Sequence, residues 1–260
     1  MSAKAIRIEV IDSGSANSFI RRHHYSGKVV PNSKIHFGVF LKERLGGVIS
    51  FGAPMHKRKM LPLVQKTKWD GMLELNRVAF TDLLPKNSES RALAISFKKI
   101  RRMCPNVEWI LSFADATQCG DGTIYRASGF ILTGININKS LARLPSGEVI
   151  ASNTITAHLH VPRKELGGKT PAEISGGGSS WKIYLQHTGG EVLTGYQLRY
   201  IYFINKAARK RLTVKEIPFS RIREIGASMY KGKRAASIDI DASAHQQKEG
   251  GESPTAALHF

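Results

Sequence analysis

The sequence has few cysteines and no long apolar run. Its two cysteines, Cys104 and Cys119, stand in no spacing that binds zinc or forms a redox motif, so a reducing compartment is expected. No apolar stretch approaches the roughly 18–20 residues that a membrane helix needs, and residues 1–18 lack the apolar stretch of a signal peptide. These absences predict a cytoplasmic protein without a membrane partner.

Acidic residues are also scarce. Only 20 Asp and Glu oppose 39 Lys and Arg among 260 residues, which gives a net charge of +19 and a pI of about 10.1. This charge predicts an anionic partner, and nucleic acid is the first candidate. Hydrophobic residues still make up 42% of the chain and prolines number only 10, which excludes a wholly disordered basic protein.

The basic residues gather in a few places. Residues 196–234 contain eleven Lys and Arg against two Glu, a net charge of +9. Two smaller clusters lie at 56–59 and 98–102. A solvated surface is the alternative interpretation of each, and it suits 98–102 best because that cluster lies on a helix with an apolar stripe. The residues predicted to contact nucleic-acid phosphates are Lys57, Arg58, Arg199, Arg209, Lys210 and Arg211.

Hydrophobic periodicity predicts an α/β fold. Apolar residues from Leu93 to Met103 repeat at helical spacing, Asn87 or Ser88 can cap this helix, and Pro105 follows its end. The predicted strands are 35–41, 45–51, 77–81, 107–114 and 130–134, with a short helix near 123–128. This order predicts a mixed sheet flanked by helices, with a parallel crossover between 77–81 and 107–114.

Composition divides the chain into four parts. Residues 1–161 are predicted to form the catalytic core, whose α/β sheet ends near residue 140 or continues through a strand at 154–161, and residues 162–180 a Gly-rich loop or linker. Residues 181–234 form a basic C-terminal extension with strand-like runs at 181–185 and 198–204, and residues 235–260 a disordered tail. Whether the extension is a separate domain or continues the same sheet stays open.

The pattern Tyr-x-x-x-Gly-Phe, formed by Tyr125, Gly129 and Phe130, resembles the signature of GCN5-related N-acetyltransferases. The order of hairpin, strand, long helix and strand agrees with that fold. The resemblance implies that Tyr125 lies beside the sulfur of a coenzyme A derivative, whose pyrophosphate is held by a loop and a helix N-terminus. The positions that would hold it are Asn87, Ser88, Ser90 and Arg91, although the family's Arg/Gln-x-x-Gly-x-Gly/Ala loop is missing.

Further motifs, in order along residues 17–232, resemble the Mom family of phage DNA-modification proteins. They are His23-His24-Tyr25-Ser26, Leu75-Asn76-Arg77-Val78-Ala79, Ser112-Phe113-Ala114-Asp115-Ala116, and the segments 195–205 and 211–214. The resemblance implies conversion of adenine in duplex DNA to N6-carbamoylmethyladenine, which protects phage DNA from host restriction. It also implies iron, and the bacterial host cytoplasm as the location of a phage-encoded protein. The implicated catalytic residues are His24, Tyr25, Arg77, Asp115 and Tyr125.

Each of these side chains has a chemical role and a structural alternative. Asp115 ends a predicted parallel strand, where it can accept a proton from adenine N6, bind a metal or cap the next segment. Arg77 can clamp a phosphate or carboxylate, or simply pair with Asp115. His24 can act as base or metal ligand, and Tyr25 as stacking platform, acid or ligand, so these two and Asp115 are the candidate iron ligands. Tyr125 is otherwise a packed aromatic.

The implied product raises a chemical question. Acyl transfer to N6 gives an amide, whereas a carbamoylmethyl group is joined to N6 through CH2. Metal-assisted or redox chemistry would account for that bond, although the His-x-Asp…His pattern of iron oxygenases does not occur. Adenine N6 is stacked and paired in duplex DNA, so base flipping is expected, with Tyr25 or Trp69 stacking on the base. The alternatives are a conventional acyl-CoA-dependent N-acetyltransferase and an inactive DNA-binding module.

Overall fold

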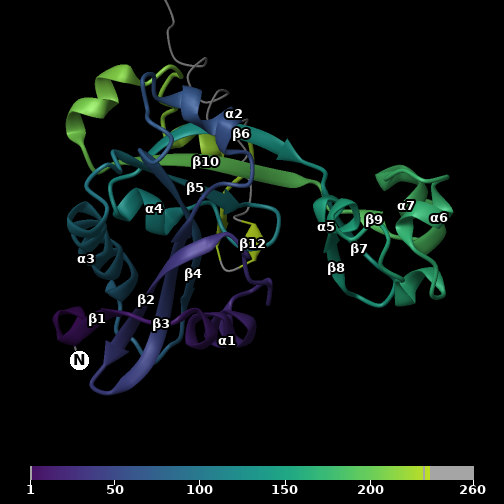
Figure 1. The fold of residues 1–260 in the computed structure, drawn as a ribbon, viewed down its shortest axis with the longest axis horizontal. Helices are drawn as coiled ribbons and strands as arrows, with labels where there is room; N and C mark the ends of the chain where they lie inside the picture. Colours follow the sequence, from purple (N-terminus) through teal and green to yellow (C-terminus); the bar gives the residue numbers. More distant parts are fainter. Residues whose placement is uncertain (1, 231, 235–260) are drawn as a thin grey trace, which may run out of the picture.

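The computed structural model describes residues 2–230 and 232–234. The tail predicted to be disordered, 235–260, lies outside the described residues. Figure 1 shows a main body built on a large sheet, with helices packed on it, and a smaller module that projects from one end.

The main body is a mixed sheet, as the sequence predicts, and it has seven strands. Its strands are β1 (Ile6–Val10), β2 (Ser33–Leu41), β3 (Arg44–Gly52), β4 (Met72–Phe80), β5 (Trp109–Asp115), β6 (Ile131–Asn138) and β10 (Gly195–Phe203). They are arranged in the order β1-β2-β3-β4-β5-β10-β6. All neighbours are antiparallel except β4 and β5, which are parallel. The predicted hairpin at 35–51 and the parallel pair around the long helix are therefore confirmed.

Helices cover both faces of this sheet. Helix α3 (Ser88–Met103) connects β4 to β5 and places Leu93, Phe97 and Ile100 in the largest core cluster. Helix α1 (Ser13–His23) packs Phe19 and Ile20 against Val48 of β3 and Ala79 of β4, in a separate cluster. Val48 and its neighbour Ile49, which lies in the α3 cluster, point to opposite faces because side chains alternate along a strand. The two helices thus lie on opposite faces of the sheet.

The pairing of β4 with β5 is short. Only three residue pairs are in register, from Met72↔Trp109 to Glu74↔Leu111. Beyond them β4 runs on to Phe80 and β5 to Asp115, without pairing to each other. Strand β4 is also irregular, because its register against β3 shifts between Ser50 and Phe51 and leaves Asn76 as an extra residue, a β-bulge. The two parallel strands therefore splay apart at their carboxyl ends.

Strand β10 lies in the predicted basic extension, residues 181–234, for which the sequence leaves open whether it continues the main sheet. It pairs with β5 on one side and β6 on the other, so it belongs to the main sheet. It covers residues 198–203 of the strand-like run predicted at 198–204. The rest of the basic segment forms η4 (Lys206–Arg211), α8 (Ser220–Glu224) and a hairpin of β11 (Met229–Tyr230) and β12 (Lys233–Arg234).

The projecting module consists of residues 139–194, inserted between the adjacent strands β6 and β10 (Figure 1). Its elements are β7 (Leu141–Arg143), β8 (Val149–Ala151), α5 (Ser152–Ala157), η3 (Lys164–Leu166), α6 (Pro171–Ile174), α7 (Trp181–Thr188) and β9 (Glu191–Val192). It has its own core of Leu144, Ile150, Ile155, Leu166 and Tyr184. The predicted boundaries at 161 and 180 both fall inside it.

Two secondary-structure predictions in this module are wrong. The run 154–161, predicted as a strand, contains the end of α5 and a turn, and 181–185, predicted as a strand, begins helix α7. Both are short apolar runs, which periodicity alone does not assign to helix or strand. In α7, Ser180 accepts a hydrogen bond from the amide of Ile183 at 3.3 Å and Gly189 ends the helix in the left-handed conformation, so the capping residues decide the outcome.

The main body also has short helical elements, the first of which is η1 (Ala3–Ala5). Helix α2 (Lys57–Met60) and η2 (Leu61–Leu63) connect β3 to β4, and α4 (Thr123–Ala127) precedes β6. The helix predicted near 123–128 is therefore confirmed. Among the described residues, no helix is both long and apolar enough to cross a membrane.

Candidate active site

The splayed ends of β4 and β5 bring the five predicted catalytic residues together. Arg77 lies on β4 and Asp115 ends β5, while His24 and Tyr25 follow α1 and Tyr125 lies on α4. Electrostatic interactions link Arg77 to His24, Tyr25 and Tyr125, and Tyr25 to Asp115. Residues far apart in the sequence thus meet in one cluster where the sheet opens.

Arg77 is held by backbone carbonyls. Its Nε donates to the carbonyl of Lys28 at 2.9 Å and its NH1 to the carbonyl of Asn76 at 2.7 Å. No ion pair to Arg77 occurs in the described part of the chain, so the proposed pairing with Asp115 is absent there. The guanidinium keeps its remaining N–H groups for an anionic or carbonyl ligand.

Asp115 organises the turn that follows β5. Its Oδ1 accepts a hydrogen bond from the amide of Thr117 at 2.9 Å, and its Oδ2 accepts one from Gln118 Nε2 at 3.1 Å. The hydroxyl of Tyr25 donates to the same Oδ2 at 3.4 Å. Asp115 therefore shapes a turn and also fixes the orientation of Tyr25, whose side chain is 52% exposed.

His24 is neutral in this environment. Burial, followed by the nearby Arg77, lowers its pKa to about 4. Its Nδ1 lies 2.9 Å from Ser26 Oγ and accepts a hydrogen bond from the Ser26 amide at 3.2 Å. Since Nδ1 is an acceptor, the ring proton resides on Nε2. The imidazole thus presents an N–H donor rather than a free base.

Tyr125 lies at the centre of an aromatic group. Its ring is 5.2 Å from Phe130 and 5.3 Å from Tyr200, measured between centroids. Burial raises the pKa of its hydroxyl, and a hydrogen bond with Ser112 of β5 opposes that rise. The hydroxyl is therefore a proton donor at neutral pH. The ring packs against the core, as the packed-aromatic alternative expects, and electrostatic interactions with Glu74 and Arg77 place the hydroxyl beside the cluster.

Glu74 is a site residue that the sequence analysis missed. Residues three apart on a regular strand face opposite sides, but the bulge at Asn76 puts Glu74 and Arg77 on the same face. Burial raises the pKa of Glu74 to about 7, while Asn76 and Arg77 oppose the rise. The amide Nδ2 of Asn76 is buried without a hydrogen-bond partner among the described residues, and Asn76 is 7% exposed. The signal available in the sequence was a Glu within an apolar strand, two residues from Asn76.

The predicted iron ligands do not fit a metal. Nδ1 of His24 already accepts a hydrogen bond and Nε2 carries the proton, while Asp115 is shared by three donors. Within residues 2–230 and 232–234, no three side chains of His, Cys, Asp and Glu are grouped closely enough to hold a metal ion. Cys119 lies near Asp115, but burial and that carboxylate raise the pKa of its thiol, which disfavours the thiolate that binds metals.

Three of the four residues predicted to hold coenzyme A line a hollow at the start of α3. Its volume is about 420 Å³, and Asn87, Ser90 and Arg91 line it together with Lys4 and Ser128. Asn87 adopts a left-handed conformation with φ of 67°, which glycine normally favours, so this loop takes a glycine-like turn without a glycine. Ser88 is buried, and its Oγ has no partner among the described residues.

The residues predicted to contact DNA differ in their exposure and in whether they form ion pairs. Arg58 and Lys210 are exposed, and Lys57 Nζ lies 5.0 Å from the centroid of the Trp69 ring, which is 59% exposed. In contrast, Arg209 pairs with Glu216 at 2.6 Å and Arg211 with Glu108 at 2.5 Å.

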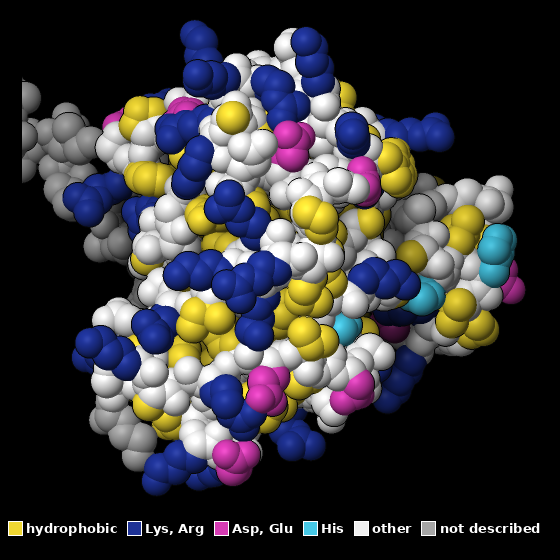
Figure 2. All heavy atoms as spheres, turned by 60° about the vertical axis from the view of Figure 1, so that its left-hand side comes forward, with side chains coloured by type: hydrophobic (Ala, Val, Ile, Leu, Met, Phe, Trp, Pro, Cys, Tyr) yellow, Lys and Arg dark blue, Asp and Glu magenta, His cyan; other side chains and the backbone are white. Residues whose placement is uncertain are grey.

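Arg199 is engaged within the sheet. Its NH2 donates to the carbonyl of Thr133 at 2.7 Å, and burial lowers its pKa. The face shown in Figure 2 carries Lys and Arg side chains over most of its extent, with few Asp and Glu among them.

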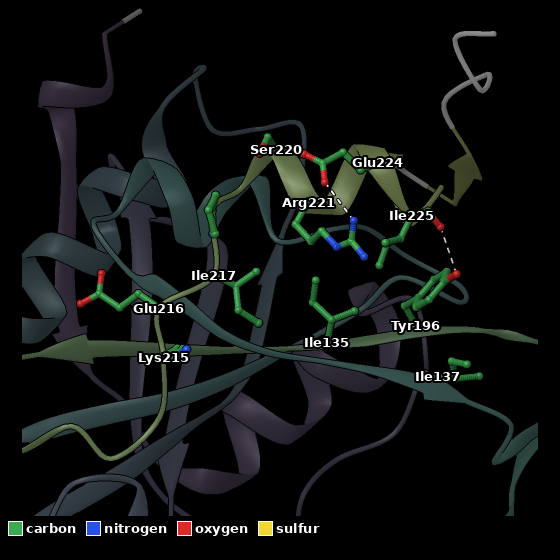
Figure 3. Close-up of a pocket in the computed structure, with 11 residues that line it drawn as sticks. Ile135, Ile137, Tyr196, Lys215, Glu216, Ile217, Ser220, Arg221, Glu224 and Ile225 are labelled. Atoms are coloured by element: carbon green, nitrogen blue, oxygen red, sulfur yellow. Dashed lines mark hydrogen bonds and ion pairs between the residues drawn. The ribbon is translucent and has the colours of Figure 1, made fainter. Parts of the chain in front are cut away.

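A second hollow lies between strands β6 and β10 and the segment that carries helix α8 (Figure 3). It has a volume of about 590 Å³ and is lined by apolar side chains such as Ile135, Ile137 and Ile225, with the Arg221–Glu224 ion pair on α8. None of the predicted catalytic residues lines it.

A seven-stranded mixed sheet flanked by helices, with the ionisable cluster where its parallel pair splays, defines the chain as a mixed α/β protein. The chain belongs to the Mom protein family, whose model matches residues 5–221. It is 35% identical over 220 residues to the methylcarbamoylase mom of Escherichia phage Mu, covering 82% of this chain and 81% of that protein. Methylcarbamoylase names a group-transfer enzyme, so the family includes a transferase.

Solved structures of similar fold have low sequence identity. FeeM, an N-acyl amino acid synthase from uncultured soil microbes, is 13% identical with a TM-score of 0.43, covering 80% of this chain and 95% of that chain. An IAA acetyltransferase from Bacillus cereus is 9% identical with a TM-score of 0.41, covering 76% of this chain and 99% of that chain.

Proposed function

We propose that this chain is a DNA-modifying transferase that converts adenine in duplex DNA to N6-carbamoylmethyladenine and so shields phage DNA from restriction. The observation that carries the proposal is the gathering of His24, Tyr25, Arg77, Asp115 and Tyr125 at the splayed strand ends. The match to the methylcarbamoylase of phage Mu and the net charge of +19 support it.

The cluster supplies groups for binding and proton transfer. Arg77 is a cation with free N–H groups, and His24 Nε2 and the Tyr125 hydroxyl are neutral donors. Such groups hold a carbonyl oxygen or a purine ring nitrogen as negative charge develops on it. Tyr25, exposed and fixed by Asp115, is placed to stack on a flipped base.

A coenzyme A derivative is the proposed acyl carrier at the hollow beside α3. Helix α3 begins at this hollow with the positive end of its dipole, and Lys4 and Arg91 add positive charge around it. The hollow is also lined by Ala127 and Ser128, which directly follow the helical turn that carries Tyr125. A phosphate held there would leave the carrier's reactive end directed toward the cluster.

Mass spectrometry of nucleosides tests the function. DNA from cells that express the full chain should contain an adenine heavier by the carbamoylmethyl group, and unmodified DNA would rule the function out. Asp115→Ala and Tyr125→Phe should abolish the modification while binding to duplex DNA survives. Persistence of activity in both variants would place the catalytic centre elsewhere. Met103→Ala, an exposed position at the end of α3, is the matched control that should leave both properties unchanged.

A further inference from the structure

We propose that the transferred group is a glycyl group, delivered as an activated ester or thioester, and that the final product forms by rearrangement of the glycyl amide within this site. The inference rests on the proposed function, since it takes N6-carbamoylmethyladenine as the product. The starting point is a mismatch: the site holds a guanidinium and neutral N–H and O–H donors, its predicted iron ligands do not fit a metal, and yet the proposed product is an N-alkyl adenine.

The mismatch is resolved because N6-glycyladenine, an ordinary amide, is an isomer of N6-carbamoylmethyladenine. N6-glycyladenine, C6–NH–CO–CH2–NH2, contains the same atoms as N6-carbamoylmethyladenine, C6–NH–CH2–CO–NH2. In the first step adenine N6 attacks the glycyl carbonyl, the bond to the ester oxygen or thioester sulfur breaks, and the N6 proton leaves with that group. This step is ordinary acyl transfer.

The second step exchanges the two nitrogens. The glycyl amine attacks purine C6 and closes a five-membered ring, while an electron pair moves onto the purine ring nitrogens. The bond from C6 to the original N6 then breaks, and this nitrogen takes a proton from the attacking amine and becomes the carboxamide. No oxidant, reductant or separate amide donor is needed, because every atom of the added group comes from glycine and from N6 itself.

Glu74 is placed to serve the second step. It sits at the last paired position of β4 and β5, where the strands begin to splay, and the bulge turns it to the face of Arg77. Only a neutral amine attacks C6, so the glycyl ammonium must lose a proton. The pKa of Glu74, about 7, lies close to the roughly 7.7–8.0 of an α-amino group, so proton exchange between them is nearly balanced.

The other groups match the charges of this step. Negative charge builds on the purine ring as the five-membered ring closes, and His24 Nε2–H and the Tyr125 hydroxyl are neutral donors beside it. The side-chain amide of Asn76 interacts with Glu74 and supplies a further donor there. An acetyl group has no amine, so the same site could carry it no further than an amide.

Isotope labelling decides between rearrangement and direct alkylation. Cells that take all their adenine from the medium, and that cannot deaminate it, express the full chain and receive adenine labelled with ¹⁵N at the 6-amino group. The modified nucleoside is isolated, and its carboxamide is hydrolysed to the carboxylic acid, which releases the amide nitrogen as ammonia. Unmodified deoxyadenosine from the same DNA is the internal control for label retention.

Rearrangement predicts that hydrolysis removes the label, from one ¹⁵N per modified nucleoside to none. Direct alkylation predicts that the label stays on the purine, and this result would overturn the inference while leaving the proposed function intact. Absence of any modified adenine would instead overturn the proposed function.

The donor is then identified with purified protein and a duplex oligonucleotide. Product formed from glycyl-tRNA indicates an ester source, and product formed from glycyl-coenzyme A a thioester source. Carbamoylmethyladenine formed from acetyl-coenzyme A alone would contradict the inference. With the productive donor, Glu74→Gln should slow the rearrangement about 100-fold, so that N6-glycyladenine of the same mass accumulates and separates chromatographically. Glu74→Asp should restore part of the rate of rearrangement. If Glu74→Gln forms less carbamoylmethyladenine without accumulating N6-glycyladenine, the proposed role of Glu74 is contradicted.

Discussion

In the candidate site, Arg77 and Glu74 lie partly buried on one strand, and the hydrogen bonds of Arg77 go to backbone carbonyls. In the basic C-terminal segment, Arg209 and Arg211 are paired with Glu216 and Glu108. In the most highly charged region of the sequence, some of the cations are thus neutralised by ion pairs within the protein. The region with little net charge keeps its ionisable groups available, at a cost in desolvation, and that cost is typical of functional sites.

The largest effect is expected at Arg77. Arg77→Lys keeps the charge but loses the fork that bonds two carbonyls at once, so modification of adenine should fall about 1,000-fold, or ~4 kcal/mol in activation free energy. Modified nucleoside formed per unit time by purified protein is the measurement. Arg7→Lys, an exchange on β1 away from the site, is the control, and equal losses in both variants would contradict a specific role.

The second effect concerns stability and pH. The pKa of Glu74 is about 7 in the folded state against 4.5 ordinarily, so the folded state binds a proton more tightly and the free energy of unfolding decreases as pH rises from 4.5 to 7. Glu74→Gln removes this loss, and it should stabilise the protein by at most about 3 kcal/mol at pH 8 and by little at pH 4.5. Urea unfolding at both pH values tests it, and equal shifts at both would contradict the assignment.

His24 has the opposite dependence. Its pKa is about 4 in the folded state against 6.5 ordinarily, so the unfolded state binds the proton more tightly and stability is lost as pH falls from 6.5 to 4. His24→Gln should therefore unfold less readily in acid than the wild type, by at most about 3 kcal/mol at pH 4, while differing little from it in proton binding above pH 7. Acid titration of the folded fraction measures this, and an unchanged acid midpoint would contradict it.

A smaller effect separates the exposed from the paired cations. Arg58 makes no ion pair among the described residues, so Arg58→Ala should lower the slope of DNA affinity against salt by about 0.9. Arg209→Ala should lower it by less, because Glu216 already offsets that charge. Binding to one duplex over a range of salt concentrations measures both slopes, and a larger change for Arg209 would reverse the assignment.

The smallest effect is expected for the acidic partner. Glu216→Gln frees Arg209 without removing it, so DNA affinity should rise while the free energy of unfolding falls by no more than ~1 kcal/mol, as usual for an exposed ion pair. Affinity and urea unfolding of the same preparation measure the two changes. A fall in affinity would show that Glu216 positions Arg209 for DNA rather than withholding it.

Local patterns in the sequence predict local structure well. The stripe from Leu93 to Met103 predicts α3, and the strands on either side of it pair in parallel as expected. The place of β10 between β5 and β6 is a long-range pairing across an inserted module, and no local pattern encodes it. Two helices of the projecting module, α5 and α7, are wrongly predicted as strands because their apolar runs are short.

The candidate site shows the same division. His24, Arg77, Asp115 and Tyr125 were found through motifs, and the structure brings them together. Glu74 was missed because strict alternation assigns it to the face opposite Arg77, and only the bulge at Asn76 reverses that assignment. Whether iron fits depends on which nitrogen of His24 carries the proton. The hydrogen bond from the Ser26 amide to Nδ1 decides this, and only the structure reveals that bond.

The junction of the projecting module has a consequence for how this fold can vary. Asn138 and Gly195, the residues that flank the module, face each other as partners in the β6–β10 ladder. Any segment whose two ends lie one strand spacing apart can therefore occupy this position, from a tight turn to a whole folded unit. Gly195 also passes so close to Thr117 that a Cβ would lie 2.5 Å from its hydroxyl, and the Thr117 amide is bonded to Asp115. A side chain at Gly195 would therefore disturb the turn at Asp115, whereas the ladder restricts the inserted residues only through the spacing of their two ends.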